Sequence, residues 1–305
     1  MKRVDAYKNC ILCPRKCGAD RLDGETGYCG QTFEPVVARA ALHYWEEPEL
    51  SGDKGSGTVF FAGCNLGCVY CQNHKISRDG RMPDRTSLPG EERDLVKLPD
   101  PSYKKTDARE LADTFLRLQG EGALNINLVT AAMFVPTILD ALDDAGSRGL
   151  TVPVVYNSSG YESVDTLKMM KGYIDIYLPD LKYLDPALAA RYSNAQDYPE
   201  VAVKAIAEMV SQTKTIIRHL VLPGHTGESK RVLEYIAKTY GTSVTVSIMS
   251  QYTPVEAILK DHPELNRRIT KREYDKVVDY ALALGLTNAY IQERSVASES
   301  FIPEF

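Results

Sequence analysis

The segment 57-GTVFFAGCNLGCVYCQN-73 decides the fold of this chain. It starts with an apolar run, 58–61, whose lack of polar alternation is typical of a strand buried on both faces of a parallel sheet. Cys64, Cys68 and Cys71 follow directly, in a CxxxCxxC array. Because parallel α/β folds place their ligand sites just after the strands, the segment predicts a thiol-lined site at the carboxyl edge of a sheet.

Strand patterns alternate with helix patterns along the rest of the chain. Six apolar runs are predicted to be strands, at 58–61, 125–129, 152–156, 174–178, 216–222 and 244–249. Six segments of helical periodicity follow them, at 106–119, 136–142, 164–170, 199–210, 229–237 and 271–284. This order predicts an α/β fold, a partial (β/α)6 barrel that is two units short of a closed eight-stranded barrel.

Two stretches fall outside this alternation of strand and helix patterns. Residues 1–50 precede the first strand and hold four cysteines, so we interpret them as a Cys-rich metal-binding module in front of a core domain, 51–305. Residues 77–105 are polar, contain prolines and lack periodicity, which predicts a long loop. That loop is either a disordered insertion, the interpretation we favour, or a lid.

Composition limits the classes of partner. The chain has 305 residues, 44% of them hydrophobic, with 36 Lys and Arg against 41 Asp and Glu, a net charge of −5. This chain can bury a full core, and its charge argues against nucleic acid as a partner. We see no secretory signal and no uninterrupted apolar run of membrane-spanning length, so we expect a cytoplasmic protein without membrane contact.

All seven cysteines lie within the first 71 residues. An odd number cannot all pair internally, and a reducing cytoplasm disfavours disulfides, so metal binding is the better interpretation. A [4Fe-4S] cube takes one thiolate on each iron, and the three cysteines of the CxxxCxxC array leave one iron open. An open iron suits S-adenosylmethionine, which chelates through its amino and carboxylate groups, whereas zinc usually takes four ligands in cysteine pairs.

With Tyr70 directly before Cys71, the array resembles that of the radical SAM superfamily. The extension CQN and the lead-in SGDKGSGTVFFAG resemble the pyruvate formate-lyase activating-enzyme-like branch. Further segments resemble an uncharacterised group of such proteins: CILCPRKC at 10–17, WEEPELSG at 45–52, NLVT at 127–130, YLPDLKY at 177–183, RHLVLPG at 218–224 and SIMSQYTP at 247–254. The resemblance implies a [4Fe-4S] cluster, S-adenosylmethionine and a low-potential electron donor of flavodoxin or ferredoxin type.

The same resemblance implies which side chains surround the cofactor. Tyr70 is expected near the adenine, and Thr130 stands where the superfamily often has a Gly-Gly-Glu segment for the methionine ammonium. The remaining expected cofactor contacts are Asn73, Asn157, Ser159, Asp180, Lys182 and Arg218. Asp180 has an alternative role as an ion-pair partner of Lys182 or Arg218. His219 and His225 are weaker candidates for proton handling.

Cys10, Cys13, Cys17 and Cys29 form a second group, in which nearby glycines permit tight turns around a metal. Four thiolates suit zinc, which the CxxCP sequence slightly favours, or a second, auxiliary iron–sulfur cluster.

The expected reaction is radical chemistry: reductive cleavage of S-adenosylmethionine to a 5′-deoxyadenosyl radical that abstracts hydrogen, from a protein or peptide, as in glycyl-radical activation. The alternatives are a small-molecule or tRNA-nucleoside reaction, or a non-catalytic iron–sulfur or zinc scaffold.

Overall fold

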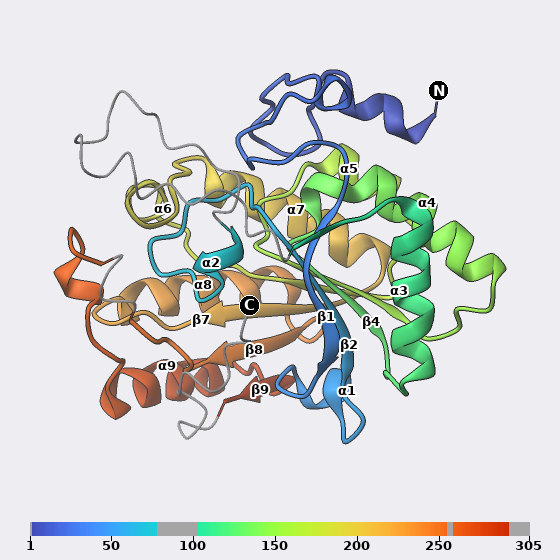
Figure 1. Ribbon diagram of the computed structural model, residues 1–305. Coiled ribbons are helices and arrows are strands. Elements are labelled where there is room, and N and C mark those ends of the chain that lie inside the picture. Colours follow the sequence, from blue (N-terminus) through green and yellow to red (C-terminus); the bar gives the residue numbers. More distant parts are fainter. Residues whose placement is uncertain (1, 78–102, 255–258, 293–305) are drawn as a thin grey trace.

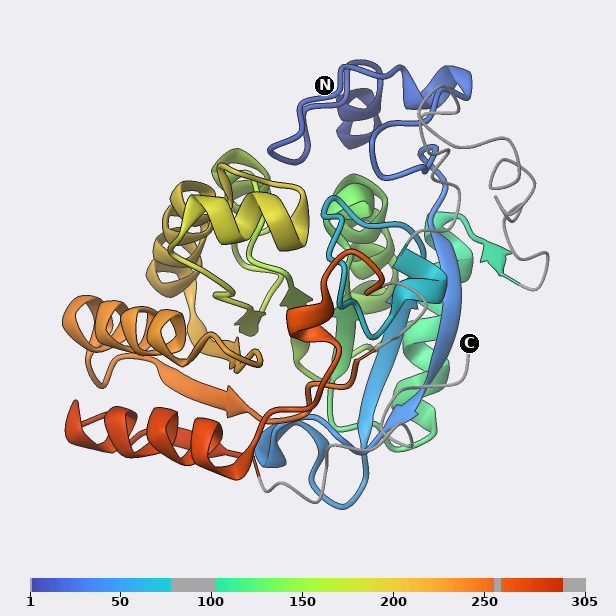
Figure 2. The same ribbon diagram turned by 90° about the vertical axis from the view of Figure 1, so that its left-hand side faces the viewer.

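The computed structural model describes residues 2–77, 103–254 and 259–292. Its centre is one sheet with the strand order β3-β1-β2-β4-β5-β6-β7-β8-β9. The sheet curls into a partial barrel with helices around its outer side (Figures 1 and 2). No helix within these ranges is long and apolar enough to cross a membrane.

The six predicted strands are confirmed and run parallel as the neighbours β2, β4, β5, β6, β7 and β8. Their bounds are β2 Ser56–Phe61, β4 Ile126–Val129, β5 Val154–Ser158, β6 Ile176–Pro179, β7 Lys214–Leu220 and β8 Thr245–Met249. All six residues of β2 are buried, as the lack of polar alternation in 58–61 predicts. Three further strands complete the sheet: β1 Val36–His43, which lies between β2 and β3, and the short edge strands β3 Lys104–Lys105 and β9 Ala289–Ile291.

The six predicted helices are also confirmed, as α3 Ala108–Gly120, α4 Val135–Ser147, α5 Val164–Met169, α7 Tyr198–Gln212, α8 Thr226–Tyr240 and α9 Lys271–Ala283. Helix α3 begins at a capping box in which the Asp107 carboxylate accepts from the Glu110 backbone amide. Shorter helical segments are α1 Pro48–Ser51, α2 His74–Ser77, α6 Pro186–Ser193 and the 3-10 turns η1 Arg3–Tyr7, η2 Arg21–Asp23, η4 Ala132–Phe134 and η5 Pro263–Leu265.

Strand β1 corrects one expectation. Residues 36–43, assigned above to the metal module, belong to the sheet and pair antiparallel with β2. Most side chains of this strand are only half-buried, and Arg39 is exposed, so its sequence lacks the unbroken apolar run that marks the central strands. The division of the chain into domains 1–50 and 51–305 stays a prediction. Of the predicted loop 77–105, residues 78–102 lie outside the described residues.

The segment before β1 packs against η4 and α4. Arg21 is fully buried and its guanidinium donates to the carbonyl oxygens of Gln31 and Met133, at 3.1 and 2.7 Å. The Tyr7 hydroxyl shares a hydrogen bond of 2.9 Å with that of Thr137. The first cysteines are therefore held at the end of the barrel where the parallel strands finish (Figure 1).

Candidate cofactor site

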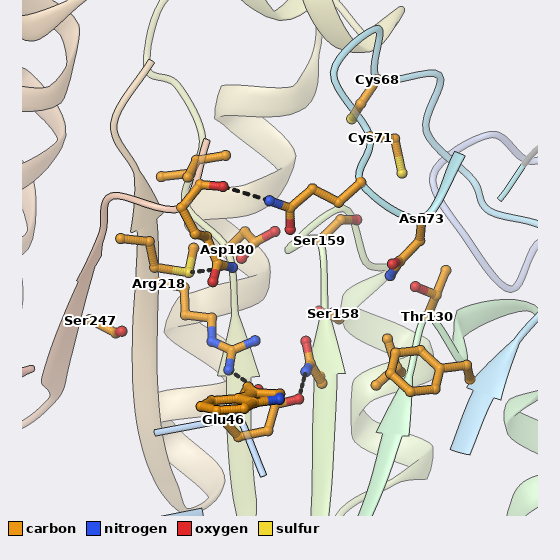
Figure 3. A pocket seen from close by; sticks show the side chains of 18 of the residues that line it. Glu46, Cys68, Cys71, Asn73, Thr130, Ser158, Ser159, Asp180, Arg218 and Ser247 are labelled. Carbon is orange, nitrogen blue, oxygen red and sulfur yellow. Dashed lines mark hydrogen bonds and ion pairs between the residues drawn. The ribbon is translucent and has the colours of Figure 1, made fainter. Parts of the chain in front are cut away.

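A cavity of about 540 Å³ lies at the carboxyl ends of the parallel strands. Its wall includes Cys64, Cys68 and Cys71 and every cofactor contact expected from the sequence: Tyr70, Asn73, Thr130, Asn157, Ser159, Asp180, Lys182 and Arg218. Figure 3 shows Cys68 and Cys71 above the strand ends, with Asn73, Thr130, Ser159, Asp180 and Arg218 around the space below them. The fold thus brings all these sequence-predicted residues to one place.

Each cysteine sulfur of the loop after β2 has a hydrogen-bonding partner. The Leu66 backbone amide donates to Cys64 Sγ at 3.3 Å, and the Ser77 hydroxyl donates to Cys71 Sγ at 3.4 Å. Cys68 Sγ lies 3.1 Å from Ser193 Oγ, at the end of α6. Because N–H and O–H donors stabilise a thiolate and tune the potential of a cluster bound to it, these surroundings fit an iron–sulfur cluster.

Tyr70 is buried on the cavity wall, and its hydroxyl is hydrogen-bonded to that of Tyr183. Burial raises the pKa of Tyr70 well above its ordinary value, so the phenol is neutral. Tyr70 therefore adds no charge to the cavity wall, and its expected contact with an adenine stays a prediction.

Thr130 follows β4 in an unusual backbone conformation. Its φ of 59° lies in the left-handed region, which is strained for a β-branched residue and easy for glycine. Its amide donates to the Asn157 carbonyl oxygen at 3.0 Å, which fixes the end of β4 against the end of β5. A threonine thus holds a conformation suited to glycine at the position where the sequence departs from the Gly-Gly-Glu pattern.

The end of β5 approaches the end of β6 very closely. At Gly160, whose φ is 76°, an added Cβ would lie 2.3 Å from the Asp180 carbonyl oxygen. The carboxylate of Asp180 pairs with the Lys182 ammonium at 2.5 Å, which is the alternative role expected for Asp180. Burial works to lower the pKa of Lys182, but Asp180 and nearby groups outweigh it and raise that pKa, so Lys182 is charged.

Arg218, on β7, does not pair with Asp180 through its side chain. Its guanidinium bridges two buried carboxylates, donating from Nε to Glu47 at 2.7 Å, from Nη2 to Glu47 at 2.5 Å, and from Nη2 to Glu46. The amides of Asn127 and Asn157 also donate to Glu46 Oε1, at 3.0 and 3.4 Å. Sequence reasoning missed both glutamates as site residues; the adjacent acids in WEEPELSG were the available signal.

The model of the Radical SAM superfamily matches residues 58–236, which is more than half of the chain. The chain belongs to the radical SAM superfamily. It is also 30% identical over 288 residues to the uncharacterised protein MJ0674 of Methanocaldococcus jannaschii, an alignment that covers 93% of this chain and 77% of the relative. The superfamily resemblance drawn from the sequence is therefore confirmed, while the activating-enzyme-like branch stays a prediction.

Solved structures were compared with this fold. SuiB of Streptococcus suis, in its complex with the precursor peptide SuiA, superimposes with a TM-score of 0.50 at 13% identity, over 75% of this chain and 46% of SuiB. The hydrogenase maturase HydG of Carboxydothermus hydrogenoformans gives a TM-score of 0.49 at 14% identity, over 78% of this chain and 54% of HydG. The radical SAM chain described here spans about half the length of these two proteins.

Radical SAM proteins use a [4Fe-4S] cluster and S-adenosylmethionine, so these cofactors follow from the family. Among the described residues, no three His, Cys, Asp or Glu side chains converge on a single metal ion. The thiolates of a cubane bind three different irons and stand apart, so the arrangement of Cys64, Cys68 and Cys71 is compatible with the cluster.

Cys17 and Cys29 lie on either side of one glycine in this radical SAM protein. An added Cβ at Gly27 would lie 2.7 Å from Cys17 Sγ and 3.9 Å from Cys29 Sγ. Cys10 and Cys29 are buried, while Cys17 is exposed. The assignment of zinc or an auxiliary cluster to Cys10, Cys13, Cys17 and Cys29 stays a prediction.

His219 and His225 do not line the cavity. His219 is buried, its Nδ1 lies 2.8 Å from the Leu181 carbonyl oxygen, and burial lowers its pKa to about 4. His225 Nε2 lies 3.0 Å from the Tyr192 hydroxyl, before α8. Neither position supports a part in proton handling at the cavity.

Proposed function

We propose that this chain is a radical SAM oxidoreductase that abstracts hydrogen from a protein or peptide, in the manner of the pyruvate formate-lyase activating enzymes. One observation carries the proposal: three hydrogen-bonded thiols line a cavity whose wall also includes Tyr44, just after β1, and Ile291, at the end of β9. We propose that a loop of another polypeptide enters this cavity.

The side chains have separate roles in this proposal. Cys64, Cys68 and Cys71 hold the cluster, and Leu66, Ser77 and Ser193 stabilise their sulfurs by hydrogen bonds. Tyr70, Asn73, Thr130, Asn157, Ser159, Asp180, Lys182 and Arg218 bind and orient S-adenosylmethionine. When bound, the cluster and S-adenosylmethionine supply a 5′-deoxyadenosyl radical.

The proposed partners follow from this chemistry. A low-potential flavodoxin or ferredoxin supplies the electron, and the proposed location is the cytoplasm, where free thiols stay reduced. A peptide substrate has a precedent in the fold, since SuiB is seen with its precursor peptide.

Anaerobic incubation with S-adenosylmethionine and dithionite tests the reaction. We expect 5′-deoxyadenosine from the reconstituted protein and none from Cys68→Ala, because the cluster loses a ligand. Ser193→Ala is the matched control: it removes only the hydroxyl beside Cys68, so product formation should be slower and still measurable. An undiminished yield from Cys68→Ala would refute the assignment of the cluster.

A second experiment tests the substrate class. Protein extracts with glycine deuterated at Cα serve as the substrate pool. Mass spectrometry of the 5′-deoxyadenosine then measures how much deuterium has been transferred from the substrate. Deuterium in the product from the macromolecular fraction supports a polypeptide substrate. Transfer that requires only the small-molecule fraction would contradict it.

A further inference from the structure

The side chain of Arg15 joins the two groups of cysteines. Arg15 belongs to the N-terminal cysteine loop, residues 10–17. Its guanidinium reaches out of that loop, and its Nε donates to the Asn65 carbonyl oxygen at 2.9 Å. Asn65 directly follows Cys64 in the cluster loop, residues 64–71. One side chain therefore connects the two loops, although 50 positions of the sequence separate the bonded residues.

The same guanidinium also binds the segment against which the cluster loop packs. Arg15 Nη2 donates to the carbonyl oxygen of Asn194, which ends α6, at 2.6 Å. The preceding residue, Ser193, contacts the cluster loop twice: its carbonyl oxygen accepts from the Gly67 amide at 3.0 Å, and its hydroxyl lies 3.1 Å from Cys68 Sγ. The guanidinium therefore ties the cluster loop to the segment that supplies the hydroxyl beside a cluster cysteine.

Aromatic rings hold the Arg15 guanidinium in place. Its Cζ lies 3.9 Å from the ring centre of Tyr28, which directly precedes Cys29, and 5.2 Å from that of Tyr161. The Asn194 side-chain amide donates to the Tyr28 hydroxyl at 3.1 Å, so the ring is fixed as well. An aromatic face attracts a guanidinium, whose planar fork can donate to two carbonyl oxygens at once. A lysine ammonium lacks that fork.

The backbone of Arg15 is bound to the first group of cysteines. Burial raises the pKa of the Cys13 thiol, and a hydrogen bond from the Arg15 backbone amide opposes that rise. The Lys16 amide donates to the Cys13 carbonyl oxygen at 3.1 Å, which closes a tight turn around Arg15. The place of the Arg15 backbone therefore depends on the place of the Cys13 sulfur, which a bound metal would fix.

We propose that Arg15 is a positioning residue for the radical cluster, which transmits the order of the metal-bound N-terminal cysteine loop to the loop of Cys64 and Cys68. Arg15 is not part of the cavity wall, so it acts through the carbonyl groups of Asn65 and Asn194. The inference goes beyond the proposed function: it depends on the cluster that the family implies and is independent of the substrate.

Electron paramagnetic resonance of the anaerobically reconstituted, dithionite-reduced protein tests this. Only a cluster with an open iron changes its signal when S-adenosylmethionine binds, so the response belongs to the radical cluster alone. Titration of the response gives the apparent cofactor affinity, and a redox titration of the same signal gives its midpoint potential.

Arg15→Ala should bind S-adenosylmethionine about tenfold more weakly and show a changed midpoint potential, because two hydrogen bonds from a charged donor are lost. Arg15→Lys should restore only part of the affinity, because it keeps the charge without the fork. Melting curves check that both variants are folded, and Arg15→Lys serves if Arg15→Ala is not.

Arg3→Ala is the matched control. Arg3 lies in the same N-terminal segment and pairs with Asp140 and Asp143 of α4, at 2.9 and 2.6 Å, so its loss also weakens the packing of that segment on the barrel. The hydrogen bonds given for its side chain go to α4 and to Tyr173, and not to either cysteine loop. The cofactor response and the midpoint potential should therefore stay unchanged.

A double replacement tests the transmission from the N-terminal site. Alanine at both Cys13 and Cys17 removes two of the four thiolates there and leaves the cluster loop unaltered. This variant should lose about as much cofactor affinity as Arg15→Ala. Adding Arg15→Ala to it should cost nothing further, because the two changes break the same connection.

Three results would overturn the inference. They are an unchanged response and potential in Arg15→Ala, an equal loss in Arg3→Ala, and losses from Arg15→Ala and from the cysteine replacements that multiply as independent effects do. The 5′-deoxyadenosine assay on the same preparations separates this inference from the proposed function. Product formation with an unchanged response in Arg15→Ala refutes only the inference, and a normal response of the parent protein without product refutes only the proposed function.

Discussion

Replacing Gly160 with alanine should destabilise the protein and separate the ends of β5 and β6. Gly160 has a φ of 76°, and an added Cβ would lie 2.3 Å from the Asp180 backbone carbonyl oxygen, a distance that real Cβ atoms do not show. The obstacle is backbone, so it cannot rotate away as a side chain would. Asp180 and Lys182 follow directly and would be displaced with it.

The expected loss of free energy of unfolding in Gly160→Ala has two parts. A left-handed φ costs an L-residue about 1–2 kcal/mol, and insertion of a methyl into a closely packed site costs about 1–3 kcal/mol more. Gly172 is the matched control, because its φ is 87° and an added Cβ would meet nothing within 4 Å. Gly172→Ala therefore measures the cost of the left-handed φ alone. Both variants lower the conformational entropy of the unfolded chain by the same amount, so that effect cancels in the comparison.

Urea unfolding followed by circular dichroism measures both variants against the parent protein. We expect Gly160→Ala to lose about 1–3 kcal/mol more free energy of unfolding than Gly172→Ala. It should also bind S-adenosylmethionine more weakly, while Gly172→Ala should bind it normally. Equal losses in the two variants would show that the close approach of β5 to Asp180 does not exist in solution.

Three further predictions follow from the site and its surroundings. Thr130→Gly should be more stable than Thr130→Ala by up to about 1 kcal/mol in urea, because only glycine relieves the left-handed strain, while both should bind S-adenosylmethionine less well; a more stable alanine variant would contradict this. Burial raises the pKa of Glu162 from 4.5 to about 8, so the folded state holds the proton more tightly than the unfolded state. The melting temperature should therefore fall as the pH rises from about 5 to 8, and Glu162→Gln should show a smaller fall over the same range. Metal analysis of the reconstituted protein should give about eight irons per chain if the N-terminal cysteines hold a cluster, or about four with one zinc, and alanine at the three loop cysteines should remove about four irons in either case.

The barrel core was predictable because its signal is local. Strands such as β2 are buried on both faces and read as unbroken apolar runs, and the helices between them keep a strict apolar periodicity. Strand β1 was missed because its side chains are mostly half-buried, and β9 because three residues carry too little pattern. The place of these two strands in the sheet depends on pairing with other segments, which sequence periodicity does not report.

The cavity was predictable in part for a similar reason. Residues that follow parallel strands share one edge of a sheet, so the positions of Asn157 and Asp180 could be inferred from the strand pattern alone. The partners of Arg218 could not, because Glu46 and Glu47 lie 172 and 171 residues away and reach it only through the antiparallel return of β1 to β2. The ion pair between Asp180 and Lys182 could be predicted, since only Leu181 lies between them in the sequence.

The segment that holds the first cysteines packs against the loop of Cys64, so its removal should affect that loop. The Arg15 guanidinium stacks 3.9 Å from the ring centre of Tyr28, and its Nε donates to the Asn65 carbonyl oxygen at 2.9 Å. An added Cβ at Gly63 would lie 2.7 Å from the Cys29 carbonyl oxygen. A protein truncated before β1 would lose the wall against which the loop of Cys64 is shaped. We therefore expect a fragment without the N-terminal cysteines to assemble the cluster less well than the full chain, although none of the four is proposed as a ligand of that cluster.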